Sequence, residues 1–340
     1  MKIKRFICEV LLFMVAFSVF SIKKHGKSEL VMGTVLNIQF FSNKKNATQI
    51  LAEAFEIAEK YDRIFSSKQA YGEIYKLNQC GFSDNPFIYL MLQEADFYHE
   101  VTGGSFDYTL FPLIKLWNIE NALTIPAEKE IVAVLKKCGT DKVKIENNQI
   151  ILNENAAVDV GGIAKGKILQ LISEYLKGQE INDFIINGGG DIVLSGLFNG
   201  KREWNIAIKD PFSESAIAGY IQMTDVTIVT SGDYERFFVA NDGKSYHHIL
   251  NPKTGYPAES DVSSVTVISS DSVRADALST ALFVMGKDKG IDFVNQHENV
   301  EAIFISSDGI TYSAGVSENV INGMRYFVVE KSAVADKSSN

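Results

Sequence analysis

The chain has 340 residues, enough for one large domain or two domains of ordinary size. Hydrophobic residues make up 46% of it and charged residues 22%, with only six prolines, which excludes a disordered protein. The 42 acidic and 33 basic residues leave a formal net charge of −9, and no stripe of Lys and Arg stands out, so we expect no nucleic acid among its partners.

The N-terminal segment has the composition of an export signal. Three positive charges precede an apolar run from Phe6 to Phe20, which has the length of a signal-peptide core and is short for a membrane-spanning helix. Two lysines follow soon after the run, which is unusual behind a cleaved signal. We therefore predict that residues 1–28 form a signal peptide or an N-terminal anchor. The protein would then be exported, either to the periplasm or to the outer face of the cytoplasmic membrane.

Helical and strand patterns mix along the rest of the chain. Apolar residues at helical spacing and helix-ending residues predict helices over Ala47–Phe65, Pro86–Val101, Pro126–Cys138 and Ile163–Leu176. Strand-like runs occupy Met32–Phe41, Lys142–Ile145, Gln149–Leu152, Asp183–Ile186, Ile192–Leu194, Trp204–Ile208, Tyr220–Met223, Val226–Val229, Phe237–Val239, Ser263–Ile268, Val300–Ile305 and Met324–Val329. There is no strict alternation of strand and helix, which favours an α+β fold over a doubly wound parallel sheet. We predict a single compact domain over residues 29–331, with mixed or antiparallel sheets and packed helices, and a disordered tail over residues 332–340.

A pair of oxygen ligands is predicted on a late helix. Arg274 to Leu282 is rich in Ala, Leu and Ser, with no Gly or Pro before Gly286, and this indicates a helix. Asp276 and Thr280 are four residues apart, so they lie on the same face of that helix. A carboxylate and a hydroxyl one turn apart can both point at one hard cation. The ordinary alternative is a solvated Asp beside a neutral Thr.

A glycine-containing turn leads from a predicted strand into the helix that begins at Ile163. Gly161 to Lys167 is one residue short of a Walker A loop, and Ile168 stands where a Ser or Thr must hold magnesium, which excludes a nucleoside triphosphatase. The free N–H groups of such a turn still suit a phosphate. The alternative is a plain helix start.

A second glycine-rich turn spans Asn187 to Asp191 and contains three consecutive glycines. It does not match the dinucleotide-binding pattern, because Val193 occupies the place of the last glycine, and this disfavours a Rossmann dehydrogenase. The turn could bring the backbone close to a ring or a phosphate, or it could simply connect two strands.

Two further segments carry candidate functional side chains. In the loop Thr102 to Asp107, Phe106 could stack on a ring and Asp107 could accept hydrogen bonds, although a loop that ends a helix would look the same. His247 and His248 are adjacent on a predicted strand, where neighbouring side chains face opposite ways, so at most one of them faces a site.

Together these segments resemble the ApbE-type FAD:protein FMN transferases, or flavin transferases. Seven matching motifs stand in the family's order, and in this order they are specific although each is weak alone. They are Met32–Thr34, Thr102–Asp107 with Pro112, Leu113 and Trp117, Asp159–Gly166, Asn187–Asp191, Thr230–Tyr234, His248–Pro257 and Ala275–Ala281.

The resemblance implies an α+β fold with the flavin in a cleft near the Gly-rich segments. It also implies a Mg²⁺-dependent reaction in which FAD gives its FMN half to a Thr or Ser hydroxyl of an acceptor protein and AMP is released. The expected acceptors are flavoprotein subunits of membrane redox complexes.

The family's site residues carry over to matching positions of this chain. The implied metal ligands are Asp276, Thr280 and the backbone carbonyl of Ala164. The implied flavin contacts are Met32, Ser105, Phe106, Asp107, Lys165, His248 and Ile249. As catalytic residues we predict Asp276, through the metal, and His248, as the general base.

The chain departs from the family pattern in two places. Lys68 and Gly72 stand where family members carry an aromatic residue and a Ser, although the nearby Tyr71 can replace the aromatic ring. Asn251 replaces a common Asp before Pro-x-Thr-Gly. Two other activities would use the same residues: a Mg²⁺-dependent FAD pyrophosphatase that gives FMN and AMP, and a non-catalytic FAD-binding protein.

Overall fold

A computed structural model describes residues 22–122, 124–153, 155–213, 215–321 and 324–329. The helices are α2 (Ala47–Phe65), α3 (Glu73–Cys80), α4 (Pro86–Val101), α5 (Phe111–Trp117), α6 (Glu128–Leu135), α7 (Ala164–Gly178), α8 (Ser272–Met285) and α9 (Lys287–Gln296), with short 3-10 helices η1 (Ile119–Asn121) and η2 (Thr140–Lys142). The strands are β1 (Lys24–Val31), β2 (Thr34–Phe41), β3 (Phe82–Ser83), β4 (Val143–Glu146), β5 (Gln149–Leu152), β6 (Phe184–Gly188), β7 (Asp191–Ser195), β8 (Trp204–Lys209), β9 (Ile217–Met223), β10 (Thr227–Gly232), β11 (Phe237–Val239), β12 (Ser245–His247), β13 (Val262–Ser269), β14 (Glu301–Ser306), β15 (Thr311–Ala314), β16 (Val316–Ile321) and β17 (Met324–Val329).

The largest sheet has eight strands in the order β1-β2-β6-β7-β10-β13-β14-β15, and all its neighbouring strands are antiparallel. A four-stranded sheet, β16-β17-β9-β8, contains one parallel pair, β17 with β9. Two smaller sheets, β3-β5-β4 and β11-β12, lie away from the large one. The predicted α+β class with mixed and antiparallel sheets is therefore confirmed.

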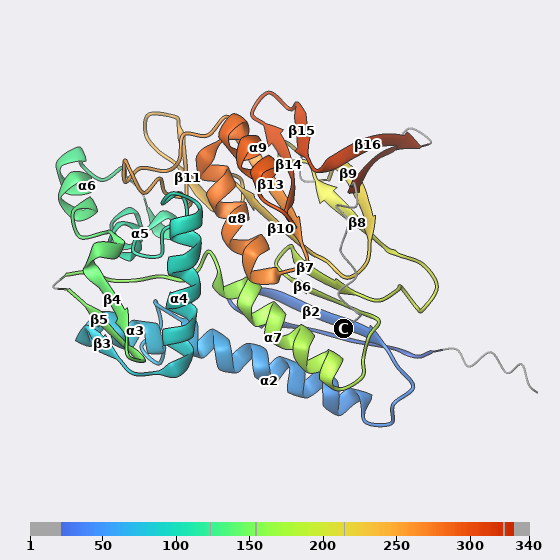
Figure 1. Cartoon of the computed structure of the whole chain (residues 1–340). Coiled ribbons are helices and arrows are strands. Elements are labelled where there is room, and N and C mark those ends of the chain that lie inside the picture. The colour runs from blue at the N-terminus through green and yellow to red at the C-terminus, as the bar shows by residue number, and fades with distance from the viewer. Residues whose placement is uncertain (1–21, 123, 154, 214, 322–323, 330–340) are drawn as a thin grey trace, which may run out of the picture.

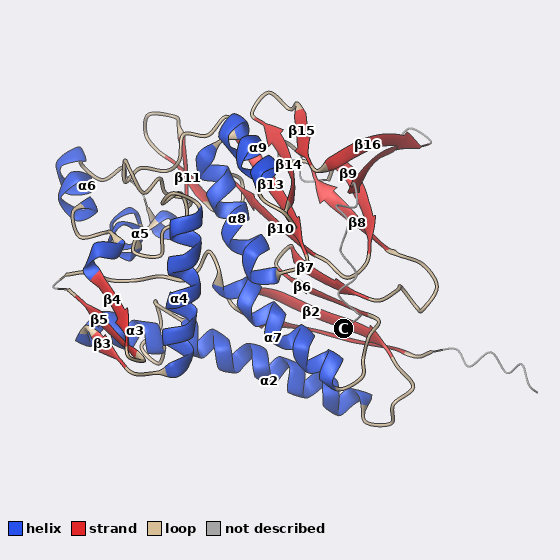
Figure 2. Ribbon diagram, in the orientation of Figure 1, coloured by secondary structure: helices blue, strands red, loops and turns tan. Residues whose placement is uncertain are grey.

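Helices α2, α7 and α8 cover one face of the large sheet (Figures 1 and 2). The main core lies between these helices and the sheet. It is built from apolar residues at helical spacing on the helices and at every second position on the strands. Strand β13 is buried along its whole length because both faces of the sheet are covered: Val265 and Val267 face the helices, and Ile268 faces a second core. That second core, formed with the four-stranded sheet, contains Leu194, Trp204, Ile206, Ile208, Ile221, Ile228 and Phe327.

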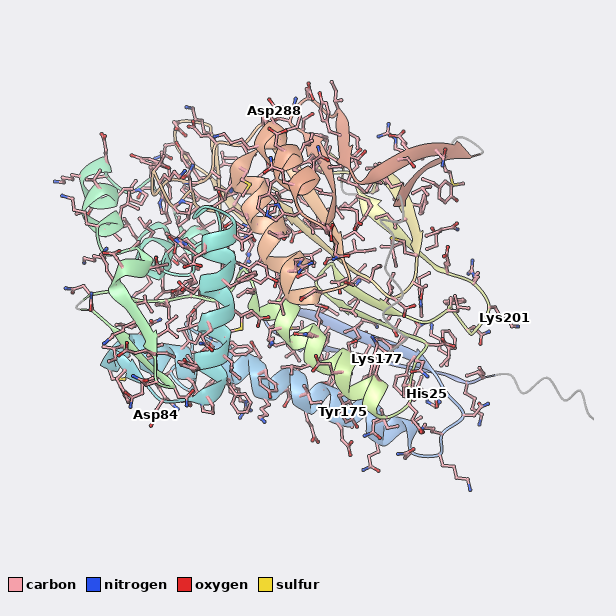
Figure 3. All side chains as sticks on the ribbon, viewed as in Figure 1. His25, Asp84, Tyr175, Lys177, Lys201 and Asp288 are labelled. Carbon is pink, nitrogen blue, oxygen red and sulfur yellow. The ribbon has the colours of Figure 1, made fainter. Side chains whose placement is uncertain are left out.

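A third, smaller core joins α5 and α6 to the loop that follows β12. Leu113, Trp117 and Ile131 pack there with Leu250. The Trp117 Nε1–H donates to the Gly255 carbonyl at 2.8 Å, which ties the loop to α5. Charged side chains such as Asp84, Lys201 and Asp288 lie at the periphery of the molecule (Figure 3). Among the residues that the structure describes, no helix combines the length and the apolar character needed to cross a membrane.

Several predicted elements match closely. Helices α2 and α4 have the predicted bounds, and the hairpin β4–β5 lies where two strands were expected. Strand β1 begins at Lys24, so residues 24–28, which we assigned to the N-terminal segment, form the first part of an edge strand. Helices α3 and α9 were not predicted. The apolar run of the expected signal segment and the expected disordered tail lie outside the described residues.

Candidate functional site

The first turn of α7 lies against the middle of α8. The backbone N–H of Gly166 donates to Asp276 Oδ2 at 2.8 Å, and the Asp276 carboxylate is buried. No side chain of α7's own sequence caps this helix, so Asp276 caps it from another element. A Cβ on Gly166 would lie 2.3 Å from the Ser272 carbonyl oxygen and 2.8 Å from Asp276 Cβ. Only glycine therefore permits this close approach.

A buried ion pair joins the two glycine-rich turns. Lys165, in the first turn of α7, places Nζ 2.5 Å from Asp191 Oδ2. Asp191 is the first residue of β7, directly after the glycine-rich turn, and its side chain is only 2% exposed. The structure thus brings together two motifs that the sequence presents separately. We call Lys165, Asp191 and Asp276 the charged cluster.

Burial determines the electrostatics of the charged cluster. Burial raises the pKa of Asp276 to about 7, and the Asp191 charge adds to this, against the opposing effects of Lys165 and the Gly166 N–H. Burial also raises the pKa of Asp191, although the Lys165 ammonium works against it. Burial alone would lower the pKa of Lys165, but the two carboxylates outweigh it and hold that pKa above its usual value. With all three groups ionised, the cluster has one excess negative charge, which a bound cation would offset.

The other two predicted metal ligands lie at the same junction. Ala164 is the first residue of α7, two residues before the Gly166 that Asp276 caps. Thr280 stands one turn beyond Asp276 on α8, as predicted, and a Cβ on Gly162 would lie 3.5 Å from its Oγ1. Over the described parts of the chain, no three His, Cys, Asp or Glu side chains are placed to hold a metal. A cation here would therefore use the carboxylate together with hydroxyl and carbonyl oxygens, a donor set that suits a hard divalent ion.

The two adjacent histidines have different partners, and only His247 lies on a strand, because β12 ends there and His248 follows it. His247 is buried, its Nε2 lies 3.0 Å from the Ala258 carbonyl, and its ring contacts the Phe283 ring edge-on. His248 places Nδ1 3.3 Å from the Arg236 carbonyl, so a proton on Nδ1 leaves Nε2 with its lone pair free. Burial, followed by the charge of Arg236, lowers the pKa of His248 to about 3, which keeps its imidazole neutral at physiological pH.

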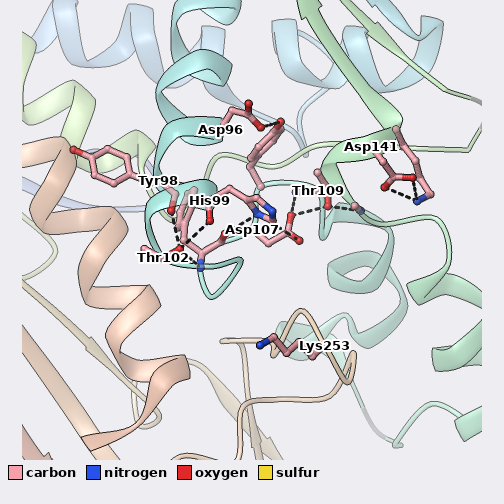
Figure 4. Close-up of polar contacts among 12 residues, drawn as sticks. Asp96, Tyr98, His99, Thr102, Asp107, Thr109, Asp141 and Lys253 are labelled. Carbon is pink, nitrogen blue, oxygen red and sulfur yellow. Dashed lines mark hydrogen bonds and ion pairs between the residues drawn. The ribbon is translucent and has the colours of Figure 1, made fainter. Parts of the chain in front are cut away.

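The loop after α4 forms a second polar cluster (Figure 4). Thr102 Oγ1 donates to the Tyr98 carbonyl at 2.7 Å and accepts from the Phe106 N–H at 3.0 Å. Asp107 Oδ1 accepts from the Thr109 N–H at 2.7 Å and from the Thr109 hydroxyl at 2.6 Å. We call His99, Thr102, Phe106, Asp107 and Thr109 the loop cluster.

Histidine completes the loop cluster. His99 Nδ1 lies 3.0 Å from the Phe106 carbonyl and 4.0 Å from Asp107 Oδ2. Lys253, on a neighbouring turn, takes no part in these contacts (Figure 4). The Phe106 ring packs against the turn before α7: a Cβ on Gly162 would lie 3.2 Å from Phe106 Cε2. Gly162 therefore lies between Phe106 of the loop cluster and Thr280 on α8.

The remaining predicted flavin contacts are spread around this centre. Met32 occupies the β1–β2 turn with a φ of 59°, its N–H donates to Asp62 Oδ2 at 3.2 Å, and its Cε lies 3.4 Å from the position of a Cβ on Gly188. It therefore borders the glycine-rich turn that ends at Asp191. Ser105 is half-buried in the loop after α4, and Ile249 packs in the main core beside His248.

Two site residues were missed by the sequence analysis. Asp191 lay inside a noted motif, but no sequence pattern links it to Lys165, 26 positions earlier. Asp159 accepts from the Gly161 N–H at 2.8 Å and from the Ser67 hydroxyl, so it shapes the turn before α7. Asp159 and Asp191 each stand at the edge of a glycine-rich turn. That position was the available signal, because acidic side chains there commonly accept hydrogen bonds from nearby N–H groups.

A cavity of about 560 Å³ lies elsewhere and contains none of the predicted site residues. Its lining includes Asn78, Cys80, Phe111, Lys115 and Lys137. The cavity volume alone would place a site at this cavity. The buried, unbalanced charge and the shifted pKa values instead indicate the charged cluster. Titratable groups with shifted pKa values gather at functional sites, so the charged cluster is the candidate site.

Comparison with known proteins finds relatives over most of the chain. The ApbE family matches residues 32–304. The FAD:protein FMN transferase of Treponema pallidum (strain Nichols) is 31% identical over 336 residues, which cover 91% of this chain and 92% of the relative. The enzyme of the same name from Klebsiella pneumoniae (strain 342) is 30% identical over 84% of this chain and 90% of the relative.

Solved structures give the same result. The crystal structure of the ApbE protein of Thermotoga maritima has a TM-score of 0.79 and 34% identity, and the match covers 86% of this chain and 97% of that one. The flavin transferase ApbE of Vibrio cholerae has a TM-score of 0.77 and 28% identity over the same shares of the two chains.

Proposed function

The chain belongs to the ApbE family and is a transferase, and we propose that it moves the FMN half of FAD to a Thr or Ser hydroxyl of an acceptor protein, releasing AMP. The observation that carries this proposal is the charged cluster at the start of α7. A buried site with excess negative charge, beside a helix N-terminus and a lysine, suits a cation and a diphosphate bound together.

The reaction would depend on Mg²⁺. Asp276, Thr280 and the Ala164 carbonyl would hold the ion, and their oxygens match its preference for hard ligands. When bound, Mg²⁺ supplies charge neutralisation of the FAD diphosphate, so that a nucleophile can approach the phosphorus. The Gly166 N–H keeps the Asp276 carboxylate fixed at this position.

Residues of the chain would bind and orient the diphosphate. The Lys165 ammonium, held by Asp191, would exchange part of that contact for a phosphate oxygen. The N–H groups of the turn that contains Gly161 and Gly162 would add partial positive charge at the N-terminus of α7. Asp159 supports this turn through its hydrogen bond from the Gly161 N–H.

His248 is our candidate for the proton acceptor. The acceptor hydroxyl would lose its proton to His248 Nε2 while its oxygen forms a bond to the FMN phosphorus. The bond from that phosphorus to the bridging oxygen breaks, and AMP leaves with the electron pair. A pKa of about 3 makes His248 a weak base, and the negative charge of bound FAD would raise that pKa.

Acceptor and location follow from the family and the N-terminus. The acceptors would be flavoprotein subunits of membrane redox complexes. The basic residues and apolar run before Ser21 support export, with the enzyme in the periplasm or attached to the outer face of the cytoplasmic membrane.

One experiment separates this proposal from its two alternatives. The enzyme is incubated with FAD, Mg²⁺ and a candidate acceptor, and both protein and small molecules are analysed by mass spectrometry. One FMN added to the acceptor supports the transferase. Free FMN and AMP without labelled acceptor would indicate a pyrophosphatase, and intact FAD would indicate a binding protein.

A further inference from the structure

Three charged side chains from distant segments meet near the charged cluster. Lys68 Nζ lies 3.2 Å from Glu120 Oε1, and Arg236 Nη1 lies 3.3 Å from the same oxygen. Lys68 belongs to the loop between α2 and α3, Glu120 to η1, and Arg236 to the loop between β10 and β11. Each side chain is about half exposed, so solvent and ligands can reach all three.

The network spans two edges of the proposed site. Lys68 follows Ser67, whose hydroxyl donates to Asp159, and Asp159 supports the Gly161 turn. Arg236 accepts hydrogen bonds at its carbonyl from the His248 backbone N–H at 3.1 Å. Glu120 therefore connects the turn before α7 with the segment that carries His248. The network lies outside the residues that the mechanism above uses.

The charge balance of the network favours an anionic ligand. Two cations share one carboxylate oxygen, which leaves one net positive charge on a chain whose overall charge is −9. The phosphate of free AMP is a monoester that carries more negative charge than Glu120 and offers three terminal oxygens, and the same phosphate within FAD offers two. The planar Arg guanidinium can bind two of them at once, and Lys can serve as a point charge beside it.

We propose that Lys68 and Arg236 form a two-cation clamp for the phosphate of the AMP half of FAD, and that Glu120 holds the clamp together when no nucleotide is bound. This inference rests on the proposed function. Lys68 stands at one of the positions where the chain departs from the family pattern, so the clamp is a property of this chain. When the nucleotide arrives, both cations turn from Glu120 to the phosphate, and Glu120 then repels the ligand. After transfer, the same repulsion favours release of AMP.

The direction in which Glu120→Gln changes AMP affinity distinguishes this clamp from a structural strap, an ion-pair network that only holds the loops together. In a strap, removing any of the three partners loosens the loops, so all variants weaken nucleotide binding. In a clamp, Lys68→Ala and Arg236→Ala remove attraction, whereas Glu120→Gln removes repulsion and frees both cations. We expect each cation variant to weaken AMP binding about fivefold, and Glu120→Gln to tighten it by a similar factor, as single exposed charge contacts do.

The measurement is isothermal titration of the full chain with AMP and, separately, with FMN, at low and high salt. Lys76→Ala is the matched control, because Lys76 also has a 55% exposed side chain and pairs with Glu73 at 2.7 Å, on the surface of α3. Since His248 bonds the Arg236 carbonyl, replacing the guanidinium leaves that contact in place. We expect AMP binding to change in the three network variants alone, and FMN binding to stay as in the wild type. The salt dependence of AMP binding should weaken in each cation variant, because one of the two cations remains.

Three results would overturn the clamp: weaker AMP binding in Glu120→Gln, unchanged AMP binding in Lys68→Ala and Arg236→Ala, or an equal loss of FMN and AMP affinity. Arg236→Lys, which keeps the charge without the planar fork, should fall between the wild type and Arg236→Ala. These titrations need no turnover. Failure of the proposed function, seen as an unlabelled acceptor, is therefore a separate result.

Discussion

The loop cluster and the charged cluster each contain a carboxylate, and the two carboxylates differ in their hydrogen-bond partners. Asp107 accepts two hydrogen bonds on Oδ1, from the N–H and the hydroxyl of Thr109, and His99 Nδ1 lies 4.0 Å from Oδ2. Asp276 is more deeply buried, and among the described residues its carboxylate accepts one hydrogen bond, from the Gly166 N–H. A carboxylate that accepts several local hydrogen bonds shapes a loop, whereas a more deeply buried one with fewer partners favours a ligand.

The largest effect should come from removing the Asp276 carboxylate. Asp276→Ala should reduce Mg²⁺-dependent transfer at least about a hundredfold, because the ion that neutralises the diphosphate loses its charged ligand. Asp276→Asn is the matched variant: its amide oxygen can still accept from the Gly166 N–H, so the helix cap survives while the charge is lost. Mass spectrometry of the acceptor and thermal unfolding measure the two effects. Full transfer by either folded variant would remove the metal assignment.

The contact between α7 and α8 offers the next largest effect. In Gly166→Ala the new methyl group would meet the Ser272 carbonyl oxygen, so the helices must separate and the charged cluster opens. We expect a loss of about 3 kcal/mol in the free energy of unfolding, measured with urea. Gly178→Ala, at the other end of the same helix, is the control: nothing lies within 4 Å of its added Cβ. It should stabilise the protein by about 0.5–1 kcal/mol.

Substitutions in the loop cluster should mainly lower the free energy of unfolding. Asp107→Ala leaves the N–H and hydroxyl of Thr109 without their acceptor, and Thr109→Val removes the hydroxyl from the same contact and from the Gly139 N–H. We expect each variant to lose about 2 kcal/mol of unfolding free energy and to change FAD affinity alike, measured by urea unfolding and fluorescence titration. A loss of FAD affinity confined to Asp107→Ala would instead support the flavin contact that the family resemblance implies.

The two clusters also differ in how far their contacts reach along the chain, which explains what the sequence could predict. Helix α4 was predicted to the residue because its signals are local: Asn85 caps it, Pro86 opens it and its apolar residues repeat at helical spacing. The shared face of Asp276 and Thr280 is local as well, since both belong to α8.

Other features could not be predicted because their partners are distant. Gly166 and Asp276 are 110 positions apart, and no sequence pattern in either segment predicts their contact. The edge strand β1 was missed because it has one exposed face and a polar sequence, which lacks the apolar alternation of a covered strand. Burial, which determines the raised pKa of Asp276, depends on the whole packed structure.

The raised pKa of Asp276 predicts a pH dependence of stability that originates in the charged cluster. The pKa of Asp276 is about 7 in the folded protein and 3.8 in an unperturbed chain, so between these values the folded state holds one more proton than the unfolded state. Without metal, this group therefore makes the protein less stable as pH rises through that window, and its contribution levels off above about pH 7. Mg²⁺ needs the ionised carboxylate, so stabilisation by Mg²⁺ should grow over the same range.

One group thus produces two trends of opposite sign. We expect the Mg²⁺-induced rise in melting temperature to be absent near about pH 5 and complete near about pH 8, and to disappear in Asp276→Asn. Asp107→Asn is the contrasting variant, because the loop cluster needs no cation and the change should leave the Mg²⁺ response intact. An equal Mg²⁺ response at both pH values in the wild type would show that the ion binds away from Asp276, and the difference between the two clusters would then lie in packing and not in ligand binding.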